Sequence, residues 1–162
     1  MESKRIALAL EPLFPERSAH LDSAVLTSVE EAWLPVMKAF FPIMFPKMPR
    51  ECLSGPSIEY YLEARKKTFG ITLDDLEAKY GGERAWQKAE PRLKKVAEIS
   101  KEDPSGPYCL GETPSYADFL IVGILEWCKN VEGGVFQRIF GIDKAFLELH
   151  DACKPWLERN DR

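Results

Sequence analysis

Apolar residues recur every three or four positions along most of this chain, which is the spacing of one buried face of an α-helix. The longest such stretch covers residues 21–40, and its apolar spacing stays in phase on both sides of Pro35. Because proline removes one backbone donor, we expect a bent helix here rather than two helices. The prolines at 42, 46 and 49 are expected to end it.

The most apolar stretch, residues 116–129, leaves scarcely a polar face, so we expect it to form the central helix. Ser115 occupies its N-cap position, and Asp118 follows three residues later. This is the spacing of a capping box with aspartate in place of glutamate, so we interpret both residues as structural caps.

Shorter amphipathic stretches predict further helices, which cover residues 3–13, 57–69, 83–101, 136–140, a segment opened by Thr72 and a last segment opened by Asp143. Ser3, Ser57 and Thr72 are interpreted as N-caps, and Pro155 is expected to bend or interrupt the last helix. No alternating strand pattern longer than a few residues and no repeat is visible. The predicted fold class is therefore all-α, with about seven helices.

Composition narrows the class of protein. The 162 residues are 45% hydrophobic and 30% charged, which suits one compact domain. The net charge is −4 and the charges are interspersed, so we expect no nucleic-acid partner. No uncharged apolar run reaches the ~18 residues of a membrane span, and the start lacks a secretory signal. We expect a cytoplasmic protein without a membrane segment.

Cysteine and histidine usage predicts neither a metal site nor a disulfide framework. Four widely spaced cysteines form no Cys-x-x-Cys pair, and only two histidines accompany them. We interpret the cysteines as buried thiols in a reducing compartment, at positions Cys52, Cys109, Cys128 and Cys153. The histidines, which stand in no nucleophile motif, are interpreted as surface or helix-end residues.

Residues 106–118 read Gly-Pro-Tyr-Cys-Leu-Gly-Glu-Thr-Pro-Ser-Tyr-Ala-Asp. This segment resembles the loop and capping box that open the core helix of the glutathione transferase carboxy-terminal domain. The closing Lys-Pro-Trp-Leu-Glu-Arg at 154–159 is similar to the terminal W-L-x-R of that family. Together with the proline-rich long helix and segment 55–61, the chain looks most like fungal, basidiomycete-type transferases related to β-etherases.

The opening Glu2-Ser3, followed by Ile6 and Leu10, resembles the last helix of the family's thioredoxin-like domain. The resemblance implies a remnant of that helix at 1–13, a linker at 14–19 and the helical domain at 20–162. It implies that Glu2 and Ser3 bind glutathione as a co-substrate, since a helix N-terminus suits an anion. For Ser3 a plain cap is an equal alternative.

The same resemblance implies that the family's thiol-activating residue and cis-proline lie in a thioredoxin-like half that is mostly missing here, so the catalytic residues stay unknown. It also implies a hydrophobic substrate pocket beside the long helix, lined by Trp33, Met37, Phe40, Met44, Tyr108 and Trp127. For each of these residues taken singly, ordinary core packing is the preferred interpretation.

Three functions remain open at this point. We favour a glutathione transferase-like enzyme that binds a hydrophobic electrophile or metabolite. The first alternative is a remodelled binding protein, isomerase or cyclase that does not need glutathione. The second is a non-catalytic interaction module. Family dimers suggest a homodimer through the long helix and its neighbour.

Overall fold

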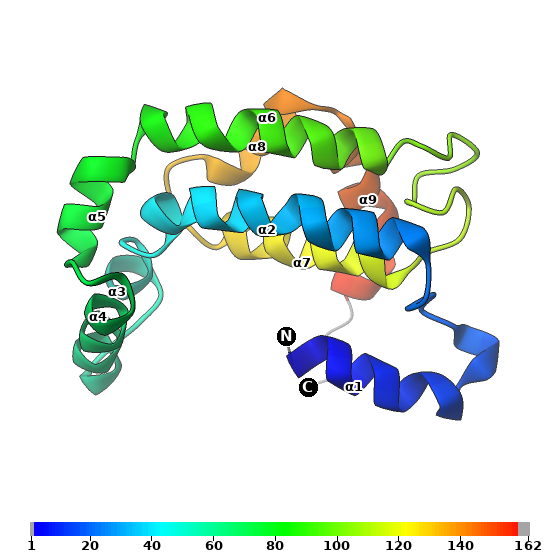
Figure 1. Ribbon diagram of the computed structural model, residues 1–162, viewed down its shortest axis with the longest axis horizontal. Helices are drawn as coiled ribbons and strands as arrows, with labels where there is room; N and C mark the ends of the chain where they lie inside the picture. The colour runs from blue at the N-terminus through cyan, green and yellow to red at the C-terminus, as the bar shows by residue number, and fades with distance from the viewer. Residues whose placement is uncertain (1, 159–162) are drawn as a thin grey trace.

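The computed structural model describes residues 2–158, apart from the side chain of Glu2, and within this range it contains no β-strand (Figure 1). Two 3-10 turns, Glu11–Leu13 and Pro15–Arg17, connect the first two helices. The helices are α1 (Glu2–Leu10), α2 (Ala24–Met44), α3 (Met48–Glu51), α4 (Pro56–Phe69), α5 (Leu73–Tyr80), α6 (Glu83–Ile99), α7 (Tyr116–Lys129), α8 (Val135–Ile142) and α9 (Ala145–Leu157). The all-α class is confirmed, and residues 2–158 contain eight helices of at least eight residues where about seven were expected.

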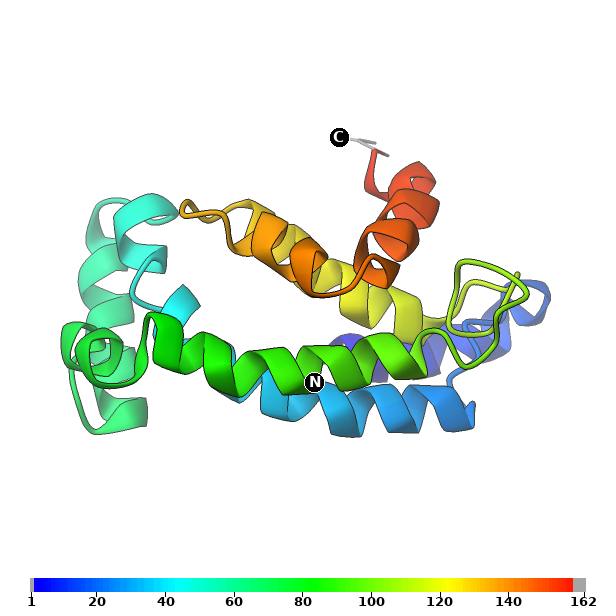
Figure 2. The same ribbon diagram turned by 90° about the horizontal axis from the view of Figure 1, so that it is seen from above.

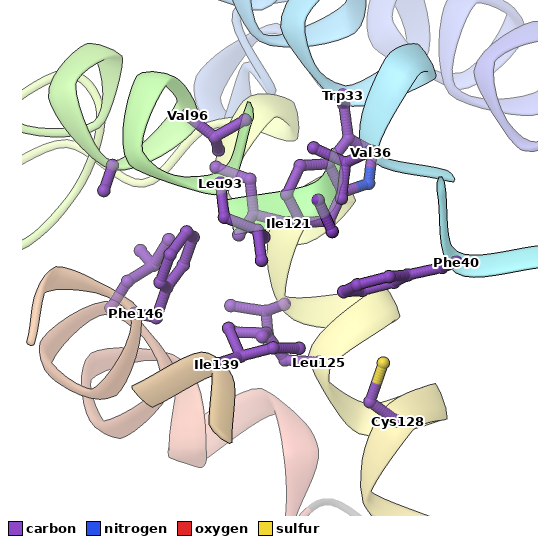
Figure 3. Close-up of a cluster of buried hydrophobic side chains, with 14 of the residues drawn as sticks. Trp33, Val36, Phe40, Leu93, Val96, Ile121, Leu125, Cys128, Ile139 and Phe146 are labelled. Atoms are coloured by element: carbon purple, nitrogen blue, oxygen red, sulfur yellow. The ribbon is translucent and has the colours of Figure 1, made fainter. Parts of the chain in front are cut away.

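The core lies where the long helices α2 and α6 pack along α7, with α8 and α9 closing its other side (Figures 1 and 2). Figure 3 shows how side chains from these elements interlock at its centre, among them Leu93 of α6, Ile121 of α7 and Phe146 of α9. Helix α7 contacts α2, α8 and α9. This explains why its sequence leaves so little polar surface.

The remaining helices occupy two ends of this bundle. Helices α3, α4 and α5 form a group at one end, between the end of α2 and the start of α6. Helix α1 lies beneath the part of the bundle that is farther from this group, and its C-terminal end points toward the loop that leads into α2 (Figure 1). Among the described residues, no helix is long and apolar enough to cross a membrane.

Helix α2 differs from the expectation at its end. Ser23 caps it by accepting a hydrogen bond from the Leu26 N–H at 3.2 Å, and the helix then continues through both Pro35 and Pro42 to Met44. The expectation that Pro42 contributes to ending the helix is therefore wrong. Pro42 is buried, so the packing of this last turn compensates for the lost backbone bond.

Other helix ends also need correction. Helix α4 begins with Pro56 after Gly55 at φ 57°, so Ser57 is not its cap. Proline suits this position because its missing N–H would have no partner there. Helix α1 starts at Glu2, which places Ser3 inside the first turn. Helix α9 continues across Pro155, so this proline does not interrupt it, and the alternative of a bend stays a prediction. At Thr72 the expected cap is confirmed, since its hydroxyl accepts from the Asp75 N–H at 3.1 Å.

The predictions for the burial of two residues, Cys52 and His150, were wrong. Cys52 is exposed, because it follows the last turn of the one-turn helix α3. His150 is buried, and its Nε2 lies 2.7 Å from Oε1 of Glu126 on α7. Its ring meets Phe136 edge-on and lies tilted against Phe140, so it belongs to the packing between α7, α8 and α9.

Candidate functional site

The entrance to α7 is organised by one buried carboxylate. Asp118 has no exposed surface and accepts three hydrogen bonds of 2.7 Å: from the N–H of Cys109, the N–H of Ser115 and the hydroxyl of Ser115. Ser115 at the N-cap is equally buried. These bonds fix the loop before α7 to the first turn of the helix. The pair is enclosed, and the geometry gives it a structural role.

Ser3 lies against the start of the same helix. Its Oγ is 3.0 Å from the Tyr116 hydroxyl, and one residue later Lys4 forms an ion pair of 2.6 Å with Glu30 of α2. These two contacts hold the first turn of α1 beside α7 and α2. The side chain of Glu2 lies outside the part that the structure describes. Glutathione binding by Glu2 and Ser3 therefore stays a prediction.

The residues predicted to line a pocket along α2 divide into two groups. Trp33, Phe40 and Met44 are at most 2% exposed, because α6 and α7 cover the face of α2 that carries them. Met37 is half-buried against the same core. In this structure Trp33, Phe40 and Met44 offer no surface to a ligand, which is the core packing preferred for each of them singly.

Tyr108 and Trp127 lie in different parts of the molecule. The Tyr108 hydroxyl donates to the carbonyl oxygen of Ala152 at 3.2 Å, and its ring contacts Trp156 of α9. Trp127, near the end of α7, donates from Nε1 to the Met48 sulfur at 3.4 Å. The fold therefore separates Tyr108 from Trp127, and Trp127 contacts the first residue of α3.

Around Trp127 the fold gathers rings from three helices and the C-cap of α2. This group, here called the aromatic cluster, has Phe45 at its centre. The ring centroid of Phe45 lies 6.1 Å from that of Trp127, 6.5 Å from that of Tyr61 and 5.7 Å from that of Phe69. The members are all half-buried and comprise Phe41, Phe45, Tyr61, Phe69 and Trp127. Partly exposed aromatic rings from several helices offer an apolar surface on which a flat ligand can stack.

Arg65 on α4 borders this cluster. Its guanidinium carbon lies 5.2 Å from the ring centroids of both Phe45 and Tyr61, which is the range of cation–π attraction. Its Nε is buried and has no hydrogen-bond acceptor among the described residues. The cluster therefore combines an apolar surface with one positive charge.

The protonation states of Tyr61 and of the three buried cysteines limit the chemistry that this part of the molecule can perform. Burial raises the pKa of Tyr61, so its hydroxyl stays protonated at neutral pH and can donate a hydrogen bond. Burial also raises the pKa of Cys109, and it raises the pKa values of Cys128 and Cys153 to about 12. These three thiols are neutral and enclosed, and therefore unsuited to nucleophilic attack.

Sequence reasoning did not single out Phe45, Tyr61 or Arg65 as site residues. A local signal was present, since Phe41 and Phe45 are four residues apart, as are Tyr61 and Arg65, and each pair shares a helix face. What the spacing could not show is that the two pairs meet. That contact depends on how α4 folds back against the end of α2.

Comparisons with known proteins agree with this architecture. A family model described as glutathione S-transferase, C-terminal domain, matches residues 24–156. The glutathione S-transferase-like protein ustS of Aspergillus flavus is 29% identical over an alignment 180 positions long, which covers 98% of this chain and 61% of that protein. The fungal-type resemblance fits this relative.

A solved structure shows the same fold. The crystal structure of a glutathione S-transferase of Ceriporiopsis subvermispora in complex with glutathione superposes with a TM-score of 0.80 at 24% identity, over 97% of this chain and 66% of that one. This chain thus spans less than two thirds of the length of either protein. The chain belongs to the glutathione S-transferase family, whose C-terminal domain it contains.

Proposed function

We propose that this chain is the ligand-binding helical part of a glutathione transferase-like enzyme, and that the aromatic cluster forms one side of its hydrophobic substrate site. Family membership supports the class of protein. The observation that carries the proposal is the set of half-buried rings around Phe45, assembled from α2, α4 and α7 at a bundle end. An apolar electrophile or metabolite stacks on these rings.

Glutathione enters this proposal as the co-substrate of a thioredoxin-like half joined to the helical part. Exposed apolar side chains on and after α1 support such a partner domain: Ile6, Leu10, Leu13 and Phe14 are 46–68% exposed. In the proposed whole enzyme, that half lowers the pKa of the glutathione thiol. The resulting thiolate attacks the electrophilic carbon of the ligand and forms a C–S bond, while the leaving group departs from that carbon with its bonding electrons. Ser3 and the α1 amides hold the γ-glutamyl carboxylate.

The first test measures binding of the neutral dye phenylnaphthylamine to the purified chain by its fluorescence. We expect saturable binding, and we expect Trp127→Ala to weaken it about tenfold, because a large ring contributes roughly 1.5–3 kcal/mol of apolar contact. Trp156→Ala is the matched control. That tryptophan is 46% exposed on α9, contacts Phe119 and Tyr108, and should leave the affinity unchanged.

Absence of saturable dye binding, or equal effects of the two tryptophan variants, would contradict the proposed site. A glutathione titration and a conjugation assay, run on the chain alone and on the chain fused to a thioredoxin-like half, separate the alternatives. Dye binding without conjugation in either form would favour a binding protein, isomerase or cyclase. Neither binding nor conjugation would favour an interaction module.

We further propose a homodimer that pairs through α2 and α6. A hollow of about 620 Å³ between these helices is lined by residues of both charges, including Glu31, Arg92 and Lys95, which can complement the same surface of a second copy. Leu34 of α2 is 57% exposed. Sedimentation of the chain should give a dimer that Leu34→Glu converts to monomer; a monomeric unsubstituted chain would contradict this.

Cytoplasmic location stays a prediction.

A further inference from the structure

The charge of Arg65 has no counterion among the residues that the structure describes. Among the described residues, ten pairs of a lysine or arginine with a carboxylate lie within 4.0 Å, from Lys4–Glu30 to Lys154–Asp151, and Arg65 takes part in none. By contrast Arg50 on neighbouring α3 contacts both Asp74 and Glu77, at 2.8 and 2.9 Å. Of these two arginines at the same end of the molecule, Arg50 is therefore paired with carboxylates, whereas Arg65 has no carboxylate partner among the described residues.

The surroundings of Arg65 make this lack of a partner significant. Its side chain is half-buried, and the faces of Phe45 and Tyr61 lie 5.2 Å from its guanidinium carbon. Two rings attract the cation but accept no conventional hydrogen bond from Nε, which is buried and has no acceptor in the part of the chain that the structure describes. A buried polar group without a partner is costly, and a guanidinium is the donor best suited to a carboxylate or similar oxyanion.

Building on the proposed function, we infer that Arg65 recognises an acidic group on the ligand, so that the preferred substrates are aromatic compounds that carry a carboxylate or sulfonate beside the ring. The ring of such a ligand stacks on the aromatic cluster. Its oxyanion accepts hydrogen bonds from the Arg65 guanidinium, and the Tyr61 hydroxyl, which is protonated, supplies a second donor nearby.

This site is separate from the one predicted for glutathione. Arg65 lies on α4, whereas Ser3 lies on α1, and Figures 1 and 2 both show these helices in different parts of the molecule. The contact of Ser3 with Tyr116 places its hydroxyl at the start of α7, while Trp127 of the cluster lies near the end of that helix. An acidic group bound at Arg65 therefore belongs to the second substrate and not to the tripeptide.

The test compares two dyes with the same aromatic framework. Anilinonaphthalene sulfonate carries an anionic group and phenylnaphthylamine does not. We expect the full chain to bind the sulfonate dye more tightly. Arg65→Met should weaken the sulfonate dye about tenfold and change the neutral dye less than about twofold, because only the anion loses a charged hydrogen bond. Arg65→Lys keeps the charge without the planar fork and should fall between.

Lys67→Met is the matched control, since it removes an equal charge from an exposed position of the same helix. If it weakens the sulfonate dye as much as Arg65→Met does, the general field of α4 and not Arg65 accounts for the preference, and the inference is overturned. Equal loss of both dyes in Arg65→Met would also overturn it, because the arginine would then only order the rings. Neutral-dye binding without any preference for the sulfonate would overturn this inference and leave the proposed function standing; no binding of either dye would overturn both.

Discussion

Replacement of Asp118 with alanine should lower the free energy of unfolding by about 4 kcal/mol, since it leaves three buried donors without acceptors at roughly 1–3 kcal/mol each. Those donors are the N–H of Cys109 and the N–H and hydroxyl of Ser115. The hydrogen bonds that would be lost join two segments of the chain, because Cys109 belongs to the loop and Ser115 to the start of α7. Urea unfolding followed by far-ultraviolet circular dichroism measures it.

Thr72→Ala provides the matched control for this prediction. Thr72 also caps a helix, by accepting from the Asp75 N–H, but its cap on α5 is exposed to solvent. Water can replace that bond, so the expected loss is about 1 kcal/mol. Similar losses in the two variants would show that the Asp118 carboxylate does not organise the entrance to α7.

Phe40→Ala should destabilise the chain by about 3–5 kcal/mol while leaving dye affinity within about twofold, because it opens a cavity in the core and removes nothing from the aromatic cluster. The Phe40 ring is 0% exposed and packs edge-on against Trp86 of α6 at 5.5 Å. Leu147→Ala on α9 is the control. Leu147 is 42% exposed and lies outside the proposed dimer interface, so its truncation should change stability by less than about 0.5 kcal/mol.

The two readouts of Phe40→Ala decide between its alternative roles. A large loss of stability with unchanged dye binding agrees with a core residue. A nearly unchanged unfolding midpoint together with abolished dye binding would contradict that assignment. It would restore the substrate pocket along α2 that the family resemblance implied.

Local patterns in the sequence were enough to predict the all-α class and the central position of α7. The apolar residues of that helix repeat with its own period, and its capping residues Ser115 and Asp118 are only three positions apart. Interactions of this kind depend only on residues that are close to one another in the sequence. The end of α2 was mispredicted because the propensity of Pro42 to stop a helix is overridden by tertiary packing that no local pattern records.

The candidate site was less predictable for a related reason. Helical spacing shows that Trp33 and Phe40 lie on one apolar face of α2, but it does not show whether helices or a ligand cover that face. The structure covers it with α6 and α7. Arg65 reads in the sequence as one more solvated charge of an amphipathic helix, and its aromatic environment arises only from the return of α4 against Phe45. Its Nε then has no acceptor among residues 2–158 as far as they are described.

A crystal structure of the chain with a bound aromatic ligand tests whether ligands bind at the aromatic cluster. We expect electron density for the ligand ring against Phe45, Tyr61 and Trp127, with any acidic group directed to Arg65. A ligand seated instead in the hollow between α2 and α6, with the cluster unoccupied, would contradict it.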